Sequence, residues 1–209
     1  MKVVLINGSP HEKGCTYTAL KEVADTLQNE GIDAEIVHIG KDPIAGCTAC
    51  GYCSRTGENR CVINDRVNQI LEKLETADGL VVGSPVYYAS PNGSLISLLD
   101  RLFLAGAQSL MALKPGAAVT SARRAGTTST LEVIQKYFTI SQMPVVSSNY
   151  WPMVHGSSPQ EVAQDKEGLQ IMRILGRNMA WMLSCIQAGE KAGINKPQAE
   201  EKIKTSFIR

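Results

Sequence analysis

Short apolar segments alternate with amphipathic segments along most of this 209-residue chain. The apolar segments predict strands at residues 2–7, 34–39, 79–83, 117–121 and 144–147. Apolar residues at helical spacing predict helices at residues 16–30, 65–76, 95–104, 128–139 and 160–189. Five strand–helix alternations predict an α/β fold, a doubly wound parallel sheet of five strands with helices on both faces.

The chain is expected to form one domain. Its length is typical of a single domain, and it contains neither an internal repeat nor a linker. We expect that domain to span residues 1–192, with a Cys-rich loop at 46–62. Residues 193–209 hold Pro197 and mixed charges, which predicts a peripheral C-terminal tail.

Charge and hydropathy exclude two classes of partner. The chain has 21 basic and 20 acidic residues, a net charge of +1, so no nucleic-acid surface is expected. Residues 79–99 carry no charge, but prolines and glycines interrupt them, which argues against a membrane span. The apolar run at residues 3–6 is too short for a signal peptide, so a cytoplasmic location is expected.

The turn after the first strand, residues 7–18, suits an anion. Small residues let backbone N–H groups approach a ligand, and Ser9, Thr16 and Thr18 add hydroxyl groups. The helix that follows points its positive end at the same place. This turn lacks the Gly-Lys-Ser/Thr ending of a P-loop. A phosphate site and an ordinary capped turn are both compatible with the pattern.

Two further loops follow the third and fourth predicted strands. Residues 83–93 place two adjacent tyrosines between two prolines. The tyrosines could form a flat wall for a planar ligand, or the segment could be a rigid turn with one tyrosine in the core. Residues 121–128 hold two arginines, which suit an electron-rich ligand edge or a solvated turn. Loops at the carboxyl ends of parallel strands meet at one sheet edge, where ligands bind.

The residues VLINGSP with Gly14 and Thr16, followed by GSPVYY at 83–88, resemble the flavodoxin-like, NADPH-dependent FMN reductase superfamily. The resemblance implies that the first loop holds the FMN phosphate, while the other two border the isoalloxazine ring. It places Ser9, Pro10, Gly14, Cys15, Thr16 and Thr18 near the phosphate. It places Pro85, Val86, Tyr87, Tyr88, Ser121, Arg123, Arg124 and Gly126 around the ring.

Four cysteines form the pattern Cys47-x2-Cys50-x2-Cys53-x7-Cys61. Clustered thiols in a reducing compartment indicate a metal or cluster site. Three cysteines at x2 spacing favour an iron–sulfur cubane over a single zinc ion. Zinc, free thiols and a redox disulfide remain alternatives. Because the loop follows the second strand, it is expected at the same sheet edge as the other loops.

The cysteine pattern together with the strand-end loops resembles the iron-sulfur flavoproteins of anaerobes. That resemblance implies a [4Fe-4S] cluster on the four cysteines beside FMN, often across a subunit interface. It also implies a homo-oligomer, a dimer or a tetramer. Residues 151–154 and the Met-rich final helix are expected to offer apolar surface for such contacts.

The predicted function is that of an FMN-dependent oxidoreductase or electron-transfer flavoprotein whose cluster exchanges electrons with FMN. NAD(P)H is a possible donor and a ferredoxin-type carrier a possible partner. No catalytic side chain is predicted, because the chain shows no Ser/His/Asp or paired-carboxylate set and a flavin carries its own chemistry. The alternatives are a cluster-free NAD(P)H-dependent FMN or quinone reductase, a non-catalytic flavodoxin-like carrier and a zinc-stabilised interaction domain.

Overall fold

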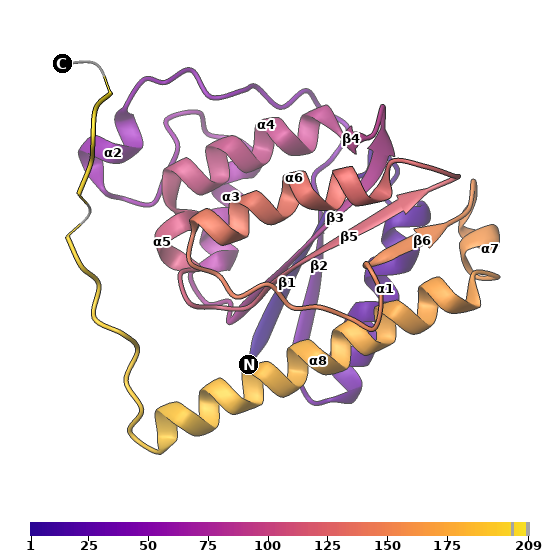
Figure 1. The fold of residues 1–209 in the computed structure, drawn as a ribbon. Coiled ribbons are helices and arrows are strands. Elements are labelled where there is room, and N and C mark those ends of the chain that lie inside the picture. The colour runs from indigo at the N-terminus through magenta and orange to yellow at the C-terminus, as the bar shows by residue number, and fades with distance from the viewer. Residues whose placement is uncertain (202, 208–209) are drawn as a thin grey trace.

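Five parallel strands form one sheet in the computed structural model, which describes residues 1–201 and 203–207 (Figure 1). Their order is β2-β1-β3-β5-β6, so the chain winds outward from β1 in both directions. A two-residue strand, β4, pairs antiparallel with the end of β3. The strands are β1 (Lys2–Asn7), β2 (Asp33–His38), β3 (Gly79–Tyr87), β4 (Ser90–Pro91), β5 (Gly116–Ala122) and β6 (Met153–His155). The predicted α/β fold is confirmed.

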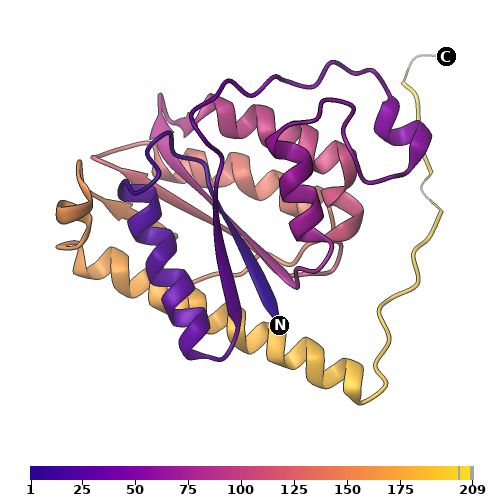
Figure 2. The same ribbon diagram turned by 180° about the vertical axis from the view of Figure 1, so that it is seen from behind.

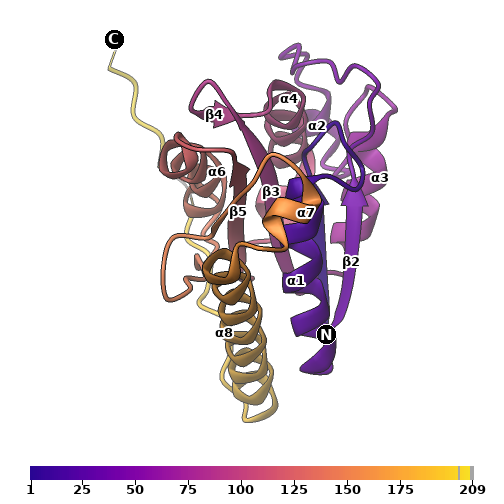
Figure 3. The same cartoon turned by 90° about the vertical axis from the view of Figure 1, so that its right-hand side faces the viewer.

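Helices cover both faces of the sheet (Figures 1 and 3). One face carries α1 (Cys15–Asn29) and α8 (Lys166–Lys191), and the other carries α3 (Arg66–Leu74), α4 (Gly93–Leu102) and α6 (Thr127–Ile140). The short helical elements are α2 (Tyr52–Thr56), a π-helical turn η1 (Phe103–Ala107), α5 (Gln108–Leu110) and α7 (Pro159–Val162). None of the described helices is both long and apolar enough to cross a membrane.

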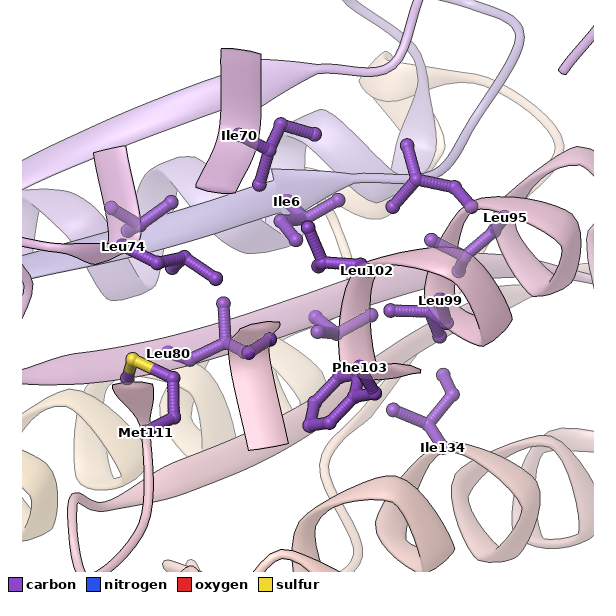
Figure 4. Close-up of a cluster of buried hydrophobic side chains, with 14 of the residues drawn as sticks. Ile6, Ile70, Leu74, Leu80, Leu95, Leu99, Leu102, Phe103, Met111 and Ile134 are labelled. Carbon is purple, nitrogen blue, oxygen red and sulfur yellow. The ribbon is translucent and has the colours of Figure 1, made fainter. Parts of the chain in front are cut away.

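Each face of the sheet supports its own apolar core. Alternate residues of β1 point to opposite faces, so Val4 and Ile6 join one core while Val3 and Leu5 join the other. Figure 4 shows the first core, where Ile6 meets side chains of α3 and α4. Burying one such side chain stabilises the fold by roughly 1.5–3 kcal/mol. Burial on both faces explains the unbroken apolar runs of the central strands.

The predicted fifth strand at residues 144–147 is wrong. Val145 makes only an isolated parallel bridge to Gly116, at the start of β5. The chain then leaves the sheet and returns as β6, which pairs with Thr120–Ala122 at the end of β5. Two separate segments therefore pair with β5 at this edge of the sheet, residue 145 at its start and β6 at its end. The apolar pattern predicted only the first.

The predicted final helix at 160–189 divides in two. The side chain of Asp165 accepts the N–H of Gly168 at 2.9 Å and starts α8 after the short α7. A Cβ at position 168 would stand 2.3 Å from Asp165 Oδ2, so a larger residue there would displace the capping carboxylate.

The apolar surface predicted for oligomer contacts is mostly interior. Met153 and Val154 lie in the sheet, while Met172 and Met179 pack in the core beneath α8. The aromatic side chains of Tyr150, Trp151 and Trp181 are exposed instead.

Candidate functional site

The first two loops touch at the carboxyl edge of the sheet. The N–H of Gly8 donates to the carbonyl of Gly83 at 2.8 Å. A Cβ at position 8 would lie 2.8 Å from that oxygen and 2.6 Å from Leu95. Only a residue without a Cβ lets the two loops come this close, so the glycine at position 8 sets the distance between them.

Side-chain and backbone groups hold the first loop in a tight turn. Asn7 Oδ1 accepts the N–H of Ser9 at 3.1 Å, and Ser9 Oγ accepts the N–H of His11 at 3.1 Å. The ring of His38 contacts the Ser9 carbonyl at 2.7 Å. Ser9 is buried, while Pro10 is half-buried above it. These contacts fix the shape of the turn and the position of the Ser9 hydroxyl.

The N-terminus of α1 is open. Gly14 is its N-cap and supplies no side-chain cap, and the first turn contains no acidic residue. Among the described residues, no acceptor takes the backbone N–H groups of Thr16 and Tyr17, and the N–H of Cys15 contacts its own thiol. A Cβ at position 14 would stand 3.0 Å from His11 Cβ and 3.8 Å from Ser9 Oγ, inside this cradle. Free N–H groups on a positive helix end fit an anion.

The two threonines of the first loop differ. Thr16 Oγ1 lies 2.8 Å from Ser121 Oγ, so the first and third loops share a buried hydroxyl pair. In such a pair one hydroxyl donates to the other, which leaves one O–H for a ligand. Thr18 Oγ1 instead donates to the carbonyl of Gly14 at 3.2 Å. Its proton is used within the helix.

The second loop is a strained hairpin. Tyr87 pairs with Ser90, and the two turn residues, Tyr88 and Ala89, have left-handed φ angles of 51° and 57°. Such turns favour Asn-Gly, so Tyr-Ala costs conformational energy. Tyr88 is fully exposed and Tyr87 is 45% exposed, so neither tyrosine is in the core. The rigid turn holds two aromatic rings at the surface, with Pro85 and Val86 half-buried at its base.

The third loop packs directly on this hairpin. Gly126 has a φ of 95°, and a Cβ there would lie 2.8 Å from both Ala89 Cα and Val86 Cγ1. Ser129 Oγ also donates to the Ala89 carbonyl at 2.8 Å. Arg123 and Arg124 are exposed beside this contact. All three predicted loops therefore meet at one place.

A fourth loop, after β6, was missed. His155 Nε2 contacts the Arg124 carbonyl at 3.2 Å, and Cys15 Sγ donates to the Gly156 carbonyl at 3.6 Å. Burial raises the pKa of the Cys15 thiol. The sequence did not predict this loop, because it placed the fifth strand at residues 144–147 and not at β6. The apolar pair Met153-Val154 followed by Gly156 was the available signal.

A large hollow in the described surface lies elsewhere. It has a volume of about 850 Å³ and is bounded by the C-terminal segment and by residues 108–113 and 140–142. Those residues precede β5 and follow α6, at the amino edge of the sheet. The hollow exists because the tail runs apart from the body (Figure 1), so it does not mark the site.

The Cys-rich loop follows β2 and arches over α4 to reach α2 (Figure 2). Cys47 and Cys50 are exposed, whereas Cys53 and Cys61 are half-buried. All four line one small cavity of about 30 Å³. Within the described ranges, no three His, Cys, Asp or Glu side chains are grouped closely enough to hold a metal ion. The four thiols thus line one cavity, but they do not stand at metal-binding distances from one another.

The cysteine cavity is not at the edge where the sequence placed it. Its wall includes Arg101, at the C-terminal end of α4, and Leu104 and Ala105 of η1, whereas the hairpin adjoins the N-terminal end of α4 at Asn92. The ten residues of α4 span roughly 15 Å at about 1.5 Å per residue. A long loop carried the cysteines away from their strand, so the two sites are not adjacent within one chain.

Two of the cysteines are polarised by their surroundings. The backbone N–H of Tyr52 lowers the pKa of the exposed Cys50 thiol. Arg101 donates to Cys61 Sγ through Nε at 3.4 Å and Nη2 at 3.3 Å. Burial opposes the charge of Arg101, but Asp65 and Cys61 outweigh it and raise the pKa of the guanidinium. The Tyr52 contact favours the thiolate of Cys50, the form that binds metals.

Comparisons with known proteins agree with this arrangement. Residues 1–158 match the sequence model of the NADPH-dependent FMN reductase family. An iron-sulfur flavoprotein of Methanocaldococcus jannaschii is 32% identical over 90% of this chain and all of its own length. An iron-sulfur flavoprotein of Methanosarcina thermophila is 28% identical over 90% of this chain and 97% of its own.

The fold is also found among solved structures. An archaeal flavodoxin superposes with a TM-score of 0.60 at 14% identity, covering 88% of this chain and 99% of its own. The five-strand order, the strand-end loops and the family match agree with one another. This chain therefore belongs to the NADPH-dependent FMN reductase family, and its relatives there include iron-sulfur flavoproteins.

Proposed function

We propose that this protein is an FMN-dependent oxidoreductase that binds FMN at the carboxyl edge of its sheet. The observation that carries the proposal is the meeting of three strand-end loops around the uncapped N-terminus of α1. The cradle fits a phosphate because it offers free N–H groups and the first turn of α1 holds no acidic side chain. Ser9, Gly14, Cys15 and Thr16 line it, with the Thr16–Ser121 hydroxyl pair at its side.

The other two loops fit the ring. Tyr87 and Tyr88 present exposed aromatic surface on a rigid hairpin, and Gly126 lets the third loop close against it. Arg123 and Arg124 place positive charge nearby, which would stabilise negative charge on a ligand. When bound, FMN supplies hydride and single-electron chemistry, so this chain binds, orients and tunes it without a catalytic side chain.

Replacing Thr16 with alanine is expected to weaken FMN binding by roughly 1–3 kcal/mol, because hydrogen bonds to charged acceptors are strong. Thr18→Ala is expected to have a smaller effect, since its hydroxyl already donates to Gly14. Isothermal titration of the FMN-free protein measures both. Thr139→Ala, another helical threonine bonded to a nearby carbonyl, is the control and should bind normally. Equal affinity in Thr16→Ala and Thr139→Ala would contradict the phosphate assignment.

We further propose that Cys47, Cys50, Cys53 and Cys61 hold a [4Fe-4S] cluster. The support is the shared cavity, the two polarised thiols and the names of the relatives. Because α4 separates the cavity from the flavin edge, electrons would pass between the cluster of one copy and the FMN of another. NAD(P)H and a ferredoxin-type carrier are the proposed electron donor and partner.

This route requires a homo-oligomer. Light scattering at micromolar concentration is expected to give at least twice the 22.6 kDa mass of one chain. The exposed rings of Tyr150, Trp151 and Trp181 are candidate contacts, because aromatic side chains are enriched at interfaces. A mass of one chain would rule out transfer between copies.

The second candidate is a cluster-free NAD(P)H-dependent FMN or quinone reductase. The matching family is named for NADPH and FMN and not for a cluster, and Cys47 and Cys50 are exposed. Iron analysis of anaerobically purified protein separates the two candidates. FMN binding and NADPH turnover without iron would favour the second.

A further inference from the structure

Arg101 has an unusual position for a charged side chain. It lies at the end of α4 with 1% of its side chain exposed, among the largest fully buried side chains of the protein. Its Nη1 and Nη2 donate to both carboxylate oxygens of Asp65, at 2.6 and 2.9 Å. Removing a charged arginine from water costs free energy. Because Arg101 is buried, ion-paired and fully hydrogen-bonded, we infer that it has a specific role.

The rest of this guanidinium fastens the Cys-rich loop. Nη1 donates to the Ala45 carbonyl at 3.3 Å, just before the loop, and Nη2 donates to the Ile63 carbonyl at 3.1 Å, just after it. Nε and Nη2 donate to Cys61 Sγ. One side chain thus joins the two ends of the loop and one of its four sulfurs.

Asn68 completes the hold on Cys61. Its Oδ1 accepts the Cys61 N–H at 2.8 Å, and its Nδ2 donates to the Cys61 carbonyl at 3.0 Å. Asn68 is 2% exposed and lies on α3, so Cys61 is fixed to the body of the protein. The exposed Cys47 and Cys50 have no comparable anchor from a core helix among the described residues.

We propose that Arg101 and Asn68 hold Cys61 as the fixed ligand on which the [4Fe-4S] cluster assembles, and that the Arg101 hydrogen bonds to sulfur raise its reduction potential. This inference rests on the proposed cluster. Hydrogen bonds to a ligating sulfur stabilise the more negative, reduced cluster. Asp65 acts in the opposite direction, because its negative charge binds the same guanidinium and disfavours the more negative, reduced cluster.

The test is an anaerobic potentiometric titration of the iron-loaded protein with dithionite as reductant. The EPR signal of the reduced cluster measures how much of the cluster is reduced at each potential. Arg101→Lys keeps the charge but loses the fork of N–H groups. We expect the ratio of reduced to oxidised cluster at fixed potential to fall about tenfold, which is 59 mV downward for one electron. Asp65→Asn keeps the N-cap of α3 and should shift the potential upward.

Arg60→Lys is the matched control, because Arg60 lies in the same loop but, among the described residues, its side chain bonds Glu72 and Asn64 and no cysteine. Opposite shifts in the two variants, with no shift in the control, would support the proposal, since general destabilisation cannot produce both signs. Loss of iron from Arg101→Lys alone, in protein that still binds FMN, would support the anchoring role.

Wild-type potentials and iron contents in both variants would overturn the inference and leave the proposed cluster intact. Absence of iron from the anaerobic wild-type protein would overturn both the cluster and this inference, while leaving FMN binding to be judged by its own titration.

Discussion

Replacing Gly126 with alanine is expected to weaken FMN binding by at least tenfold and to lower the free energy of unfolding by about 2–3 kcal/mol. A left-handed φ of 95° is unfavourable for any residue with a Cβ. In addition, the new Cβ would lie 2.8 Å from the Ala89 backbone, which cannot give way as a flexible side chain would. The third loop and the hairpin would have to separate, and the space for the ring would change. Chemical denaturation and FMN titration measure the two effects.

Gly31→Ala is the matched control for this variant. Gly31 also has a left-handed φ, 76°, but a Cβ at this position would meet no other part of the chain within 4 Å, and the residue follows the C-terminal end of α1. It should lose about 1 kcal/mol of stability from backbone strain alone and keep full FMN affinity. If Gly126→Ala retained the FMN affinity of Gly31→Ala, the convergence of loops would not be the basis of the flavin site.

Anaerobically purified protein is expected to contain about four irons per chain, and Cys50→Ser is expected to lose them while still binding FMN. The proposed site gives each of the four irons one cysteine thiolate, and a serine hydroxyl is a poor substitute for a polarised thiolate. The cavity lies at the opposite end of α4 from the flavin loops, so the substitution should leave FMN affinity unchanged. Iron and sulfide analysis with FMN quantification gives the result.

Cys185→Ser provides the comparison, because Cys185 is exposed on α8 and far along the chain from the Cys-rich loop. Its iron content should equal that of the wild type. Full iron in Cys50→Ser would contradict the ligand assignment, and simultaneous loss of FMN would contradict the separation of the two sites.

Local patterns were sufficient to predict the central sheet. Strands such as β1 and β3 are buried on both faces, which leaves an unmistakable apolar run in the sequence. The strand-end loops followed from topology, because parallel strands bring their carboxyl ends together. The contacts that join them, such as Gly126 against Ala89, depend on three-dimensional approach and have no sequence pattern.

Two features needed the structure. The edge strand was misplaced because residues 144–147 are as apolar as β6, and only hydrogen bonding to β5 distinguishes a single bridge from a strand. The cysteine cavity was misplaced because a long loop can end far from the strand that precedes it. Its position is set by Arg101 on α4, a residue 40 positions away from Cys61 that no spacing rule connects to the motif.

The absorption spectrum of anaerobically purified protein, reconstituted with FMN and desalted, tests the central claim most directly. The predicted spectrum has resolved visible flavin bands and a broad shoulder that bleaches when dithionite is added. A spectrum without flavin bands would contradict FMN binding at the carboxyl edge of the sheet.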